Sequence, residues 1–148
     1  MTAGSSNADV LSGVWLFAGL DRERLEKLAT FTFSKSYTPG DSIVEEGRTG
    51  NGLYVITSGR VEVVKAFNTE RATRLAVLEA GEFFGEMALL TEWPRSATVR
   101  AIEPTACVGI DRWLFLEQLR KDAQLAIVML QALAKRLRET DDRVIRQG

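Results

Sequence analysis

Between Phe31 and about Asp111, short apolar stretches alternate with closely spaced breaks that contain glycine. Stretches of this length between such breaks are typical of β-strands. The segment 31–111 is therefore predicted to be a mainly β, antiparallel body of about eight strands, a jelly-roll-like β-roll. The breaks are Pro39-Gly40, Gly47, Thr49-Gly50-Asn51-Gly52, Ser58-Gly59 and Ala80-Gly81.

Two of the predicted strands, Leu53–Thr57 and Arg60–Phe67, are separated only by Ser58-Gly59. Residues 60–63 alternate polar and apolar side chains, as a half-buried strand does. A two-residue link ending in glycine is typical of a β-hairpin, so these strands are predicted to pair. Further strands are predicted at Thr73–Leu78, Ser96–Ile102 and Thr105–Ile110, the last two turning at Glu103-Pro104.

The segment before the β body is predicted to be helical. Asp21 lies at an N-cap position, with leucines around it spaced as a hydrophobic staple. A helix is therefore expected from about Arg22 to Thr30, within an N-terminal helical segment at 10–30. Residues 1–9 are small and polar, and we expect a disordered tail there, ahead of a single domain at 10–148.

Two further helices are predicted after the β body, within 112–146. Asp111 is expected to cap the first, which runs to about Arg120. The second begins near Asp122 and is amphipathic, with charged side chains toward its polar end. Its apolar residues recur at three- and four-residue intervals, at Ala126, Leu130, Leu133 and Leu137.

Composition excludes several classes of function. The 148 residues include no His and one Cys, so the chain cannot build an imidazole-based nucleophilic site, a His-ligated metal site or an internal disulfide. No pattern supports an enzyme, and we expect no catalytic residue, metal or cofactor, with Cys107 a buried small hydrophobe. Its 19 basic and 20 acidic residues give a net charge of −1, which makes no electrostatic case for a nucleic-acid partner.

The apolar runs of the chain are too short for a membrane. None reaches the roughly 18 uninterrupted apolar residues that a spanning helix needs. The small polar residues 1–9 also lack the pattern of a secretory signal. We therefore expect a cytoplasmic protein with no membrane span.

One stretch, 81–99, interrupts the β pattern. It holds two glycines, a glutamate and a short apolar helix of two turns or fewer, before Pro94-Arg95-Ser96-Ala97-Thr98 opens a strand. A helix start offers unpaired N–H groups to a phosphate, and Gly85 lets a ligand approach the backbone closely. Arg95 can make a charge-assisted, forked contact with phosphate oxygens, and Glu86 can accept a ribose hydroxyl. The stretch therefore predicts a local site for an anion joined to a sugar.

Each of these residues also has a simpler interpretation. An arginine after proline can be a solvated loop side chain, and a glutamate in a first helical turn can serve only to stabilise the helix dipole. The combination of glycine, glutamate, apolar helix, arginine and small hydroxylated residues at tight spacing favours a binding site. Gly50-Asn51-Gly52, by contrast, lacks the third glycine of a dinucleotide-binding loop, and it is predicted to be a turn.

The interrupting stretch resembles the phosphate-binding cassette of the cyclic-nucleotide-binding domain family. That family includes the catabolite activator proteins, the regulatory subunits of cAMP-dependent kinase and the cyclic-nucleotide-gated channels. The matching runs are Phe84-Gly85-Glu86-Met87-Ala88-Leu89-Leu90 and Pro94-Arg95-Ser96-Ala97-Thr98-Val99. The usual sequence pattern of the family is also matched outside the cassette, at residues 16–20, 39–43, 46–47 and 53–63. The resemblance therefore covers about residues 16–137.

The resemblance implies a role for each cassette residue. Arg95 would pair with the cyclic phosphate, Glu86 would accept the ribose 2′-hydroxyl, and Ser96 would add a hydroxyl to the phosphate or purine. Backbone N–H groups around Gly85, Glu86, Met87 and Ala97 would complete the cradle. The remaining ligand-binding positions carried over are Phe84, Ala88 and Val99.

The residue after the cassette arginine bears on the choice of base. In the family, threonine there is associated with cGMP and alanine with cAMP. Ser96 lies between the two, as it does in members that respond to cAMP. The ligand is therefore expected to be cAMP, with some tolerance of cGMP.

The resemblance also implies two roles for the last helix. In the family this helix closes over the purine as a lid, and in the transcription factors it pairs two subunits. Channel members place a base-stacking arginine near the position of Arg136, although a solvated arginine on the polar helix face is the simpler interpretation. We therefore expect a regulatory module that signals to an unidentified protein by moving this helix, with homodimer formation left open. The alternative is a β-roll that binds no nucleotide and serves as a scaffold or protein-interaction domain.

Overall fold

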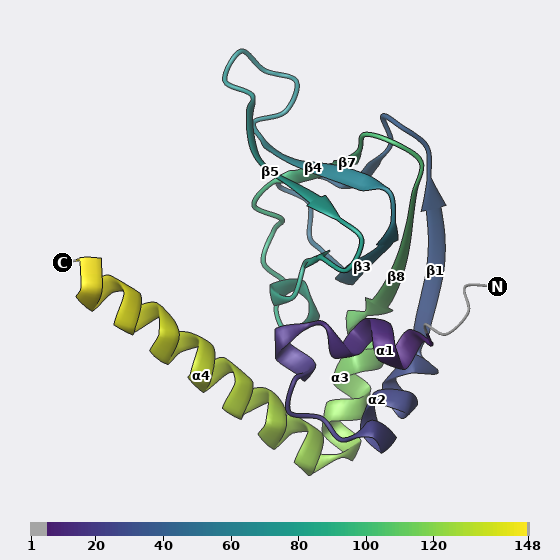
Figure 1. Cartoon of the computed structure of the whole chain (residues 1–148), viewed down its shortest axis with the longest axis vertical. Coiled ribbons are helices and arrows are strands. Elements are labelled where there is room, and N and C mark those ends of the chain that lie inside the picture. The colour runs from purple at the N-terminus through teal and green to yellow at the C-terminus, as the bar shows by residue number, and fades with distance from the viewer. Residues whose placement is uncertain (1–5, 148) are drawn as a thin grey trace.

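The computed structural model describes residues 6–147, with side chains described for residues 6–141. Within this range eight antiparallel strands form two four-stranded sheets that face each other as a roll, with helices gathered at one end (Figure 1). The first sheet has the strand order β1–β8–β3–β6 and the second the order β2–β7–β4–β5. The predicted eight-stranded β-roll with flanking helices is confirmed.

The elements follow one another in an order that places the roll between two helical segments. The strands are β1 (Thr32–Tyr37), β2 (Ser42–Val44), β3 (Gly52–Ser58), β4 (Arg60–Lys65), β5 (Thr73–Glu79), β6 (Phe83–Phe84), β7 (Thr98–Ala101) and β8 (Thr105–Asp111). The helices are α1 (Asn7–Ser12), η1 (Trp15–Phe17), α2 (Arg22–Ala29), η2 (Met87–Leu89), α3 (Arg112–Lys121) and α4 (Ala123–Gln147), of which η1 and η2 are short 3₁₀ helices. None of the helices in the described part of the chain has the length and apolar character needed to span a membrane.

Strands β3 and β4 do not pair, so the hairpin predicted across Ser58-Gly59 is wrong. β3 lies between β8 and β6, whereas β4 lies between β7 and β5 in the other sheet. Residues 52–56 of β3 are all buried, and a strand buried on both faces needs cover from a second layer. Gly59, with a φ of +90°, turns the chain toward that layer, and a Cβ there would lie 2.6 Å from Thr105 Cα.

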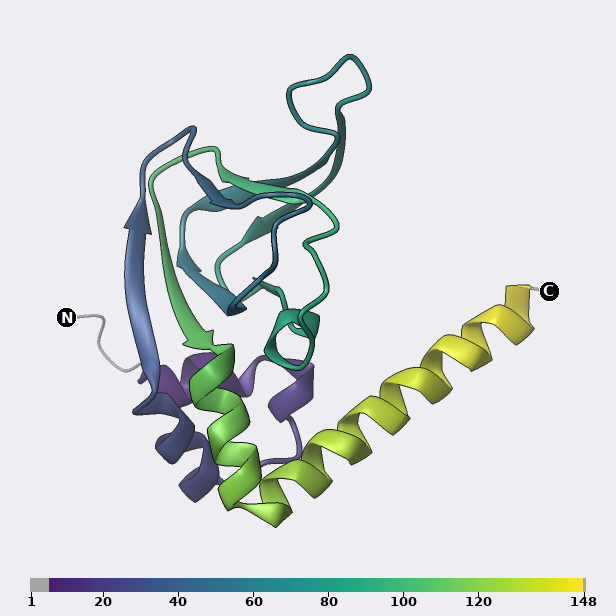
Figure 2. The ribbon, with the colours of Figure 1, turned by 180° about the vertical axis from the view of Figure 1, so that it is seen from behind.

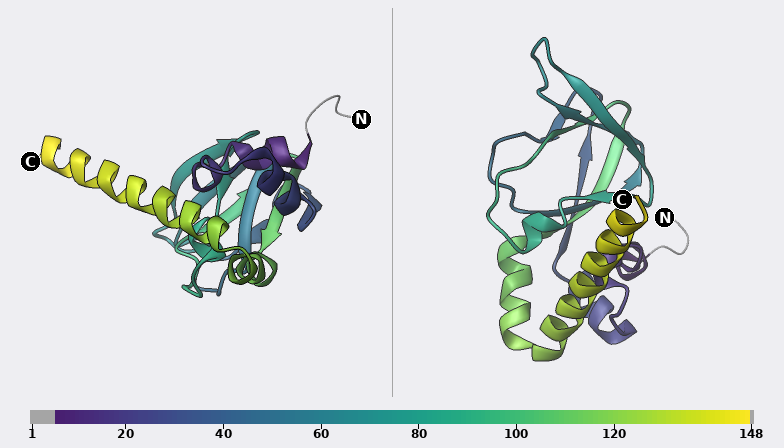
Figure 3. Two further views of the ribbon diagram at one scale, coloured as in Figure 1. Left: turned by 90° about the horizontal axis from the view of Figure 1, so that it is seen from below. Right: turned by 90° about the vertical axis from the view of Figure 1, so that its left-hand side faces the viewer.

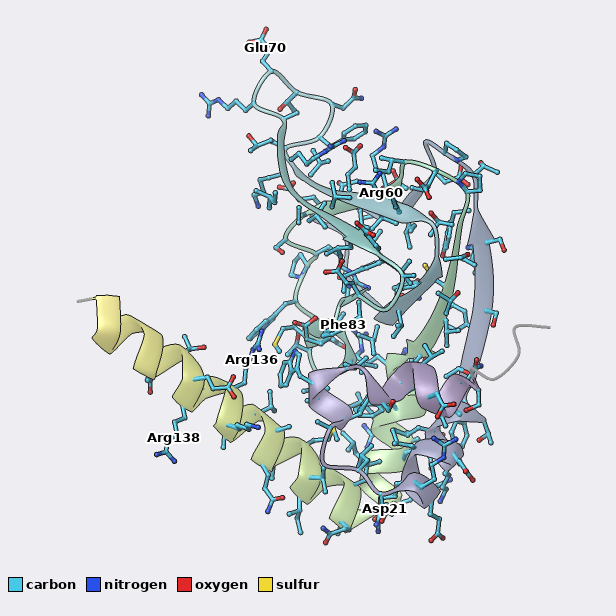
Figure 4. All side chains as sticks on the ribbon, in the orientation of Figure 1. Asp21, Arg60, Glu70, Phe83, Arg136 and Arg138 are labelled. Atoms are coloured by element: carbon cyan, nitrogen blue, oxygen red, sulfur yellow. The ribbon has the colours of Figure 1, made fainter. Side chains whose placement is uncertain are left out.

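The hairpin of the second sheet joins β4 to β5 instead. Arg60 pairs with Glu79 at one end of this ladder and Lys65 with Thr73 at the other. The connecting loop, residues 66–72, projects from the roll at the top of Figure 1, and Figure 4 labels Glu70 near its tip. β4 is therefore a strand, as predicted, but its hairpin partner is the strand that follows rather than the strand before.

The apolar core has two parts, one inside the roll and one under the helices. Both bury side chains from strands that are distant in the sequence, so the two sheets and the helices are stabilised together. Cys107 lies fully buried in the first part, as predicted, and burial raises the pKa of its thiol to about 11. The first part consists of Tyr37, Tyr54, Ile56, Val61, Phe84, Val99, Ala101 and Cys107. The second includes Leu11, Val14, Leu16, Phe17, Leu28, Leu53, Leu89, Ile110, Phe115, Leu125 and Met129.

The first helix begins before the predicted domain boundary. Ser6 caps α1 by accepting a hydrogen bond from the Asp9 N–H at 3.2 Å, and Ala8 is buried. Residues 7–9 therefore belong to a helix, and the predicted disordered tail at 1–9 is wrong for them, while residues 1–5 lie outside the described residues. The small, polar composition of residues 1–9 suggested disorder. One capping side chain and two buried side chains, Ala8 and Leu11, are nevertheless enough to fix this helix.

The two predicted capping aspartates are confirmed. Asp21 accepts a hydrogen bond from the Arg24 N–H at 2.8 Å and opens α2. Asp111 accepts hydrogen bonds from Trp113 N–H and Leu114 N–H and opens α3. Each cap satisfies backbone donors that the first helical turn leaves unpaired, which is why the starts of both helices could be predicted.

Helix α4 packs against the body only through its first half and then extends away from the roll (Figures 1 and 2). Its buried side chains are those of Leu125, Val128 and Met129. Leu130 and Leu137, two residues of the apolar repeat identified in the sequence, are 66% and 64% exposed. The view from below in Figure 3 shows the same projection. Leu130 and Leu137 therefore lie on a second apolar face of α4, which is exposed to solvent.

Candidate functional site

The chain turns sharply at Gly85, between β6 and η2. Gly85 has a φ of +88°, a conformation that favours glycine. A Cβ at this position would overlap Nη1 of Arg95 and lie 2.7 Å from Gly52 O. In the turn that follows, Ala88 N–H donates the first hydrogen bond, to Gly85 O at 3.0 Å. The N–H groups of Glu86 and Met87 precede that bond, so the hydrogen bonds of this turn do not use them.

The backbone of Arg95 is fixed by the segment 47–49. Arg95 N–H donates to Arg48 O at 2.8 Å, and Gly47 N–H donates to Arg95 O at 2.9 Å. Thr49 pairs with Pro94 in an isolated β-bridge. Because the chain is held on both sides of Arg95, the position of its side chain is set by backbone hydrogen bonds rather than by a free loop.

The Arg95 side chain lies in a slot between two glycines. A Cβ on Gly50 would overlap its Nε and lie 2.7 Å from its Cζ, and Gly85 closes the other side. Its Nη2 donates to Gly52 O at 2.8 Å, and its Cζ lies 6.0 Å from the centroid of the Tyr54 ring. Nε is buried and has no hydrogen-bond partner among the described residues. Glycine at both positions is what allows a guanidinium to reach this depth.

Burial gives Arg95 its electrostatic character. Desolvation is the main reason that the pKa of the guanidinium is lowered from its usual value, and the nearby charge of Arg112 lowers the pKa further. The carboxylate of Glu86 and the Tyr54 ring act in the opposite direction. No carboxylate in the described part of the chain forms an ion pair with Arg95. A partly buried cation without such a partner is costly, and an anion beside it would offset that cost.

Arg95 lines a cavity of about 310 Å³ in which the predicted site residues meet. Three valines, Val44 of β2, Val63 of β4 and Val99 of β7, come from neighbouring strands of one sheet and give the cavity an apolar side. Every predicted ligand-binding residue except Arg136 lines this cavity: Phe84, Gly85, Glu86, Met87, Ala88, Arg95, Ser96, Ala97 and Val99. The cavity thus combines a cation, a carboxylate and backbone donors with an apolar side, which suits an anionic ligand that carries a flat apolar group.

Arg136 does not reach this cavity. It lies on α4, and its Cζ is 5.0 Å from the centroid of the Trp15 ring of η1. Both residues line a second cavity of about 320 Å³ between α4 and η1. Figure 4 shows Arg136 pointing from α4 toward the body of the domain and Arg138 pointing away from it. In this helix position Arg136 contacts a tryptophan and cannot cover a ligand beside Arg95.

Several residues that shape the site were not predicted. Gly50-Asn51-Gly52 is not the turn that the sequence suggested, because the turn falls at Glu46-Gly47 and Gly52 already opens β3. Thr91, Trp93 and Pro94 line the cavity together with Val44 and Val63. The available signal was the pair Gly50 and Gly52 at the start of a strand whose first five residues are buried, since glycine in a strand often marks a close approach of another group.

Arg112, the first residue of α3, connects the site to the C-terminal helices. It is 6% exposed, and its Nη1 donates to Gly50 O at 2.6 Å and Thr91 O at 3.0 Å. Its own N–H donates to Asn51 O at 2.7 Å. One buried side chain thus joins the slot around Arg95, the end of the cassette and the start of α3. Sequence reasoning gave no sign of this role.

Within the described part of the chain, no group of three or more Cys, Asp or Glu side chains is arranged to hold a metal ion. The cavity beside Arg95 also contains neither a cysteine nor a pair of adjacent carboxylates. The arrangement can hold an anion by charge and hydrogen bonds.

Comparison with known families gives one match. Residues 34–122 match the model of a family described as "Cyclic nucleotide-binding domain". The matched range runs from β1 to the end of α3 and includes the whole cavity beside Arg95.

Three similar proteins illustrate the match. A protein named "cGMP-dependent protein kinase" from Eimeria tenella is 37% identical over 132 residues, which are 87% of this chain and 13% of that protein. A "Cyclic AMP receptor protein" from Thermus thermophilus is 34% identical over 131 residues, which are 88% of this chain and 61% of that protein. The crystal structure of the N-terminal domain of a transcriptional regulator from Streptomyces coelicolor A3(2) superposes with a TM-score of 0.83 at 32% identity, covering 92% of this chain and 95% of that one. The chain thus spans less than two thirds of either curated relative.

Proposed function

The chain belongs to the cyclic nucleotide-binding domain family, and we propose that it is a cytoplasmic regulatory module that binds cAMP in preference to cGMP and releases it unchanged. The observation that carries the proposal is the state of Arg95. Its guanidinium is largely buried, one of its donors has no partner among the described residues, and it lines a cavity with room for a ligand. A cyclic phosphate would supply the missing negative charge.

In the proposed complex each cassette residue contacts a different part of the nucleotide. Arg95 pairs with the cyclic phosphate, and Glu86 accepts a hydrogen bond from the ribose 2′-hydroxyl. The N–H groups of Gly85, Glu86, Met87 and Ala97 complete the phosphate cradle. The three valines that line the cavity, Val44, Val63 and Val99, lie beside the base.

The preference for cAMP depends on Ser96. This side chain is exposed at the cavity and carries one hydroxyl, which can contact the phosphate or the purine. The named relatives include a cGMP-dependent kinase and a cyclic AMP receptor protein, so both nucleotides are reasonable ligands of this family. We expect cAMP to bind more tightly, and a cGMP affinity more than tenfold higher than that for cAMP would reverse the proposed order.

The proposed output is a movement of α4. In the observed position this helix extends away from the roll. Arg112 connects its neighbour α3 to the cassette at Thr91 O and to the slot around Arg95 at Gly50 O. A ligand that shifts the cassette would therefore also shift the start of α3. A changed position of α4 is what an unidentified partner or neighbouring domain would detect.

A second copy of this chain is the proposed partner of the exposed face of α4. Ile127, Leu130, Ala134 and Leu137 recur at intervals of three and four residues, and all four are exposed. That spacing is the a/d repeat of a two-stranded coiled coil. Light scattering is expected to give the mass of a dimer, and the double substitution Leu130→Glu with Leu137→Glu the mass of a monomer. Glu139→Lys, at the f position of the repeat and farthest from the a/d contact, is the control. A wild-type monomer at high concentration would exclude the dimer.

Thermal unfolding tests binding against the scaffold alternative. A ligand that binds only the folded state stabilises it by about 2.7 kcal/mol at 100 times its dissociation constant. We therefore expect cAMP to raise the unfolding temperature in a concentration-dependent way, and 5′-AMP, which carries a doubly charged open phosphate, to raise it much less. The absence of any shift with saturating cAMP or cGMP would favour a scaffold that binds no nucleotide.

A further inference from the structure

Trp93 is the largest side chain that both lines the cavity and stays exposed to solvent. Its exposed fraction is 67%, whereas Phe84, the other aromatic residue of the cavity, is buried. Single exposed apolar side chains are common on protein surfaces and need no explanation by themselves. The position of Trp93 is what matters, because its ring borders the one cavity that gathers Arg95 and Glu86.

The loop that carries Trp93 is held in place. Trp93 N–H donates to Thr91 Oγ1 at 3.4 Å, and Thr91 Oγ1 donates to Met87 O at 3.0 Å. Pro94 follows directly, which restricts the backbone of the residue before it to extended conformations. Pro94 is in turn bridged to Thr49. The indole is therefore presented to the cavity by a constrained backbone, which lowers the entropy lost when it contacts a ligand.

An aromatic side chain at this cavity can stack on the base of a cyclic nucleotide. With the phosphate on Arg95 and the ribose on Glu86, the base extends along the apolar side formed by the valines. In the observed position of α4, Arg136, the residue expected to cover the base, contacts Trp15 instead. Trp93 is the remaining large planar side chain at the cavity that is not already packed in the core.

We propose that the indole of Trp93 stacks on the purine base of the bound cyclic nucleotide. This inference rests on the proposed function and adds a residue to the same site. Stacking of a base on an aromatic side chain tolerates any base, because every base has a π face. Trp93 therefore raises affinity for cAMP and cGMP alike, and the choice between them is left to Ser96.

The test compares ligands with and without a base. Trp93→Ala is expected to weaken cAMP and cGMP binding by a similar factor, about tenfold, and Trp93→Phe to recover most of that loss. Ribose 3′,5′-cyclic phosphate, which lacks the base, is expected to compete equally well on wild type and Trp93→Ala. Trp113→Ala is the matched control, since Trp113 is 63% exposed but lies on α3 outside the cavity.

Each outcome decides the matter. Unchanged cAMP affinity in Trp93→Ala would overturn the stacking role while leaving the proposed function intact. An equal loss for cAMP and for the base-free probe would also overturn it, because Trp93 would then support the phosphate cradle and not the base. If wild type binds none of the cyclic nucleotides, both the stacking role and the proposed function fail.

Discussion

Replacing Arg136 by alanine should strengthen cAMP binding rather than weaken it. In the observed position of α4, the Arg136 guanidinium lies 5.0 Å from the centroid of the Trp15 ring. We infer that this contact stabilises the position in which the helix extends away from the roll. A cation–π contact at an exposed site contributes about 0.5–1 kcal/mol. If α4 must move when the ligand binds, that contact opposes binding by the same amount. Its removal should raise cAMP affinity by about two- to fivefold.

The assay is a calorimetric titration of cAMP into wild type, Arg136→Ala and Arg138→Ala. Arg138 is on the same helix but points away from the body, so its variant removes an equal charge without the contact (Figure 4). Trp15→Leu should match the effect of Arg136→Ala, and the double variant should add nothing further, because both remove one interaction. A fall in affinity with Arg136→Ala would refute this reasoning and restore the purine-capping role predicted from the sequence. Equal affinities would show that the contact does not oppose binding.

Three further predictions test the site and the stability of the fold around it. Gly50→Ala should weaken cAMP binding about tenfold, the equivalent of ~1.4 kcal/mol, because a Cβ there overlaps the buried guanidinium. Gly40→Ala is the control: its φ of +93° disfavours alanine, but its Cβ would meet no atom closer than 3.9 Å and it lies outside the cavity, so it should lower stability and leave affinity unchanged. A hydrogen bond from Arg24 lowers the pKa of Asp122 below its usual 3.8, so this carboxylate stabilises the fold at neutral pH and loses that contribution as the pH falls below 3.8 through the lowered pKa. Asp122→Asn, which keeps a capping side chain, should therefore reduce the difference between urea midpoints at pH 7 and pH 3. The Cys107 thiol, with a pKa of about 11, should react with a thiol reagent at pH 8 only when the protein unfolds, and rapid labelling of the folded protein would contradict its burial.

Local rules predicted those parts of the fold that depend on neighbouring residues. Asp21 and Asp111 were identified as caps because a capping side chain bonds to N–H groups two or three residues away. The link Ser58-Gly59 was misread because a two-residue turn looks the same in sequence whether the strands pair or enter different sheets. What decides between them is the burial of β3 on both faces by strands from elsewhere in the chain.

The cassette was predictable because its residues are close in sequence and rich in groups that bind anions. The slot around Arg95 was not, because Gly50 and Tyr54 reach it from a distant segment and nothing in their own neighbourhood marks them. Arg112 escaped notice for the same reason. The position of Arg136 depends on where helix α4 packs. That packing is set by the buried residues near the start of the helix, Leu125, Val128 and Met129, rather than by the residues next to Arg136.

The most direct test of the account is calorimetry of the wild-type chain and Arg95→Ala with cAMP, using Arg71→Ala on the exposed β4–β5 loop as the control. A charge-assisted hydrogen bond contributes about 1.5–3 kcal/mol. Wild type and Arg71→Ala should bind one cAMP per chain with equal affinity, and Arg95→Ala should bind at least about tenfold more weakly, the equivalent of ~1.4 kcal/mol. Equal cAMP affinity in all three proteins, or no binding by wild type, would contradict the claim that Arg95 holds the phosphate of a cyclic nucleotide.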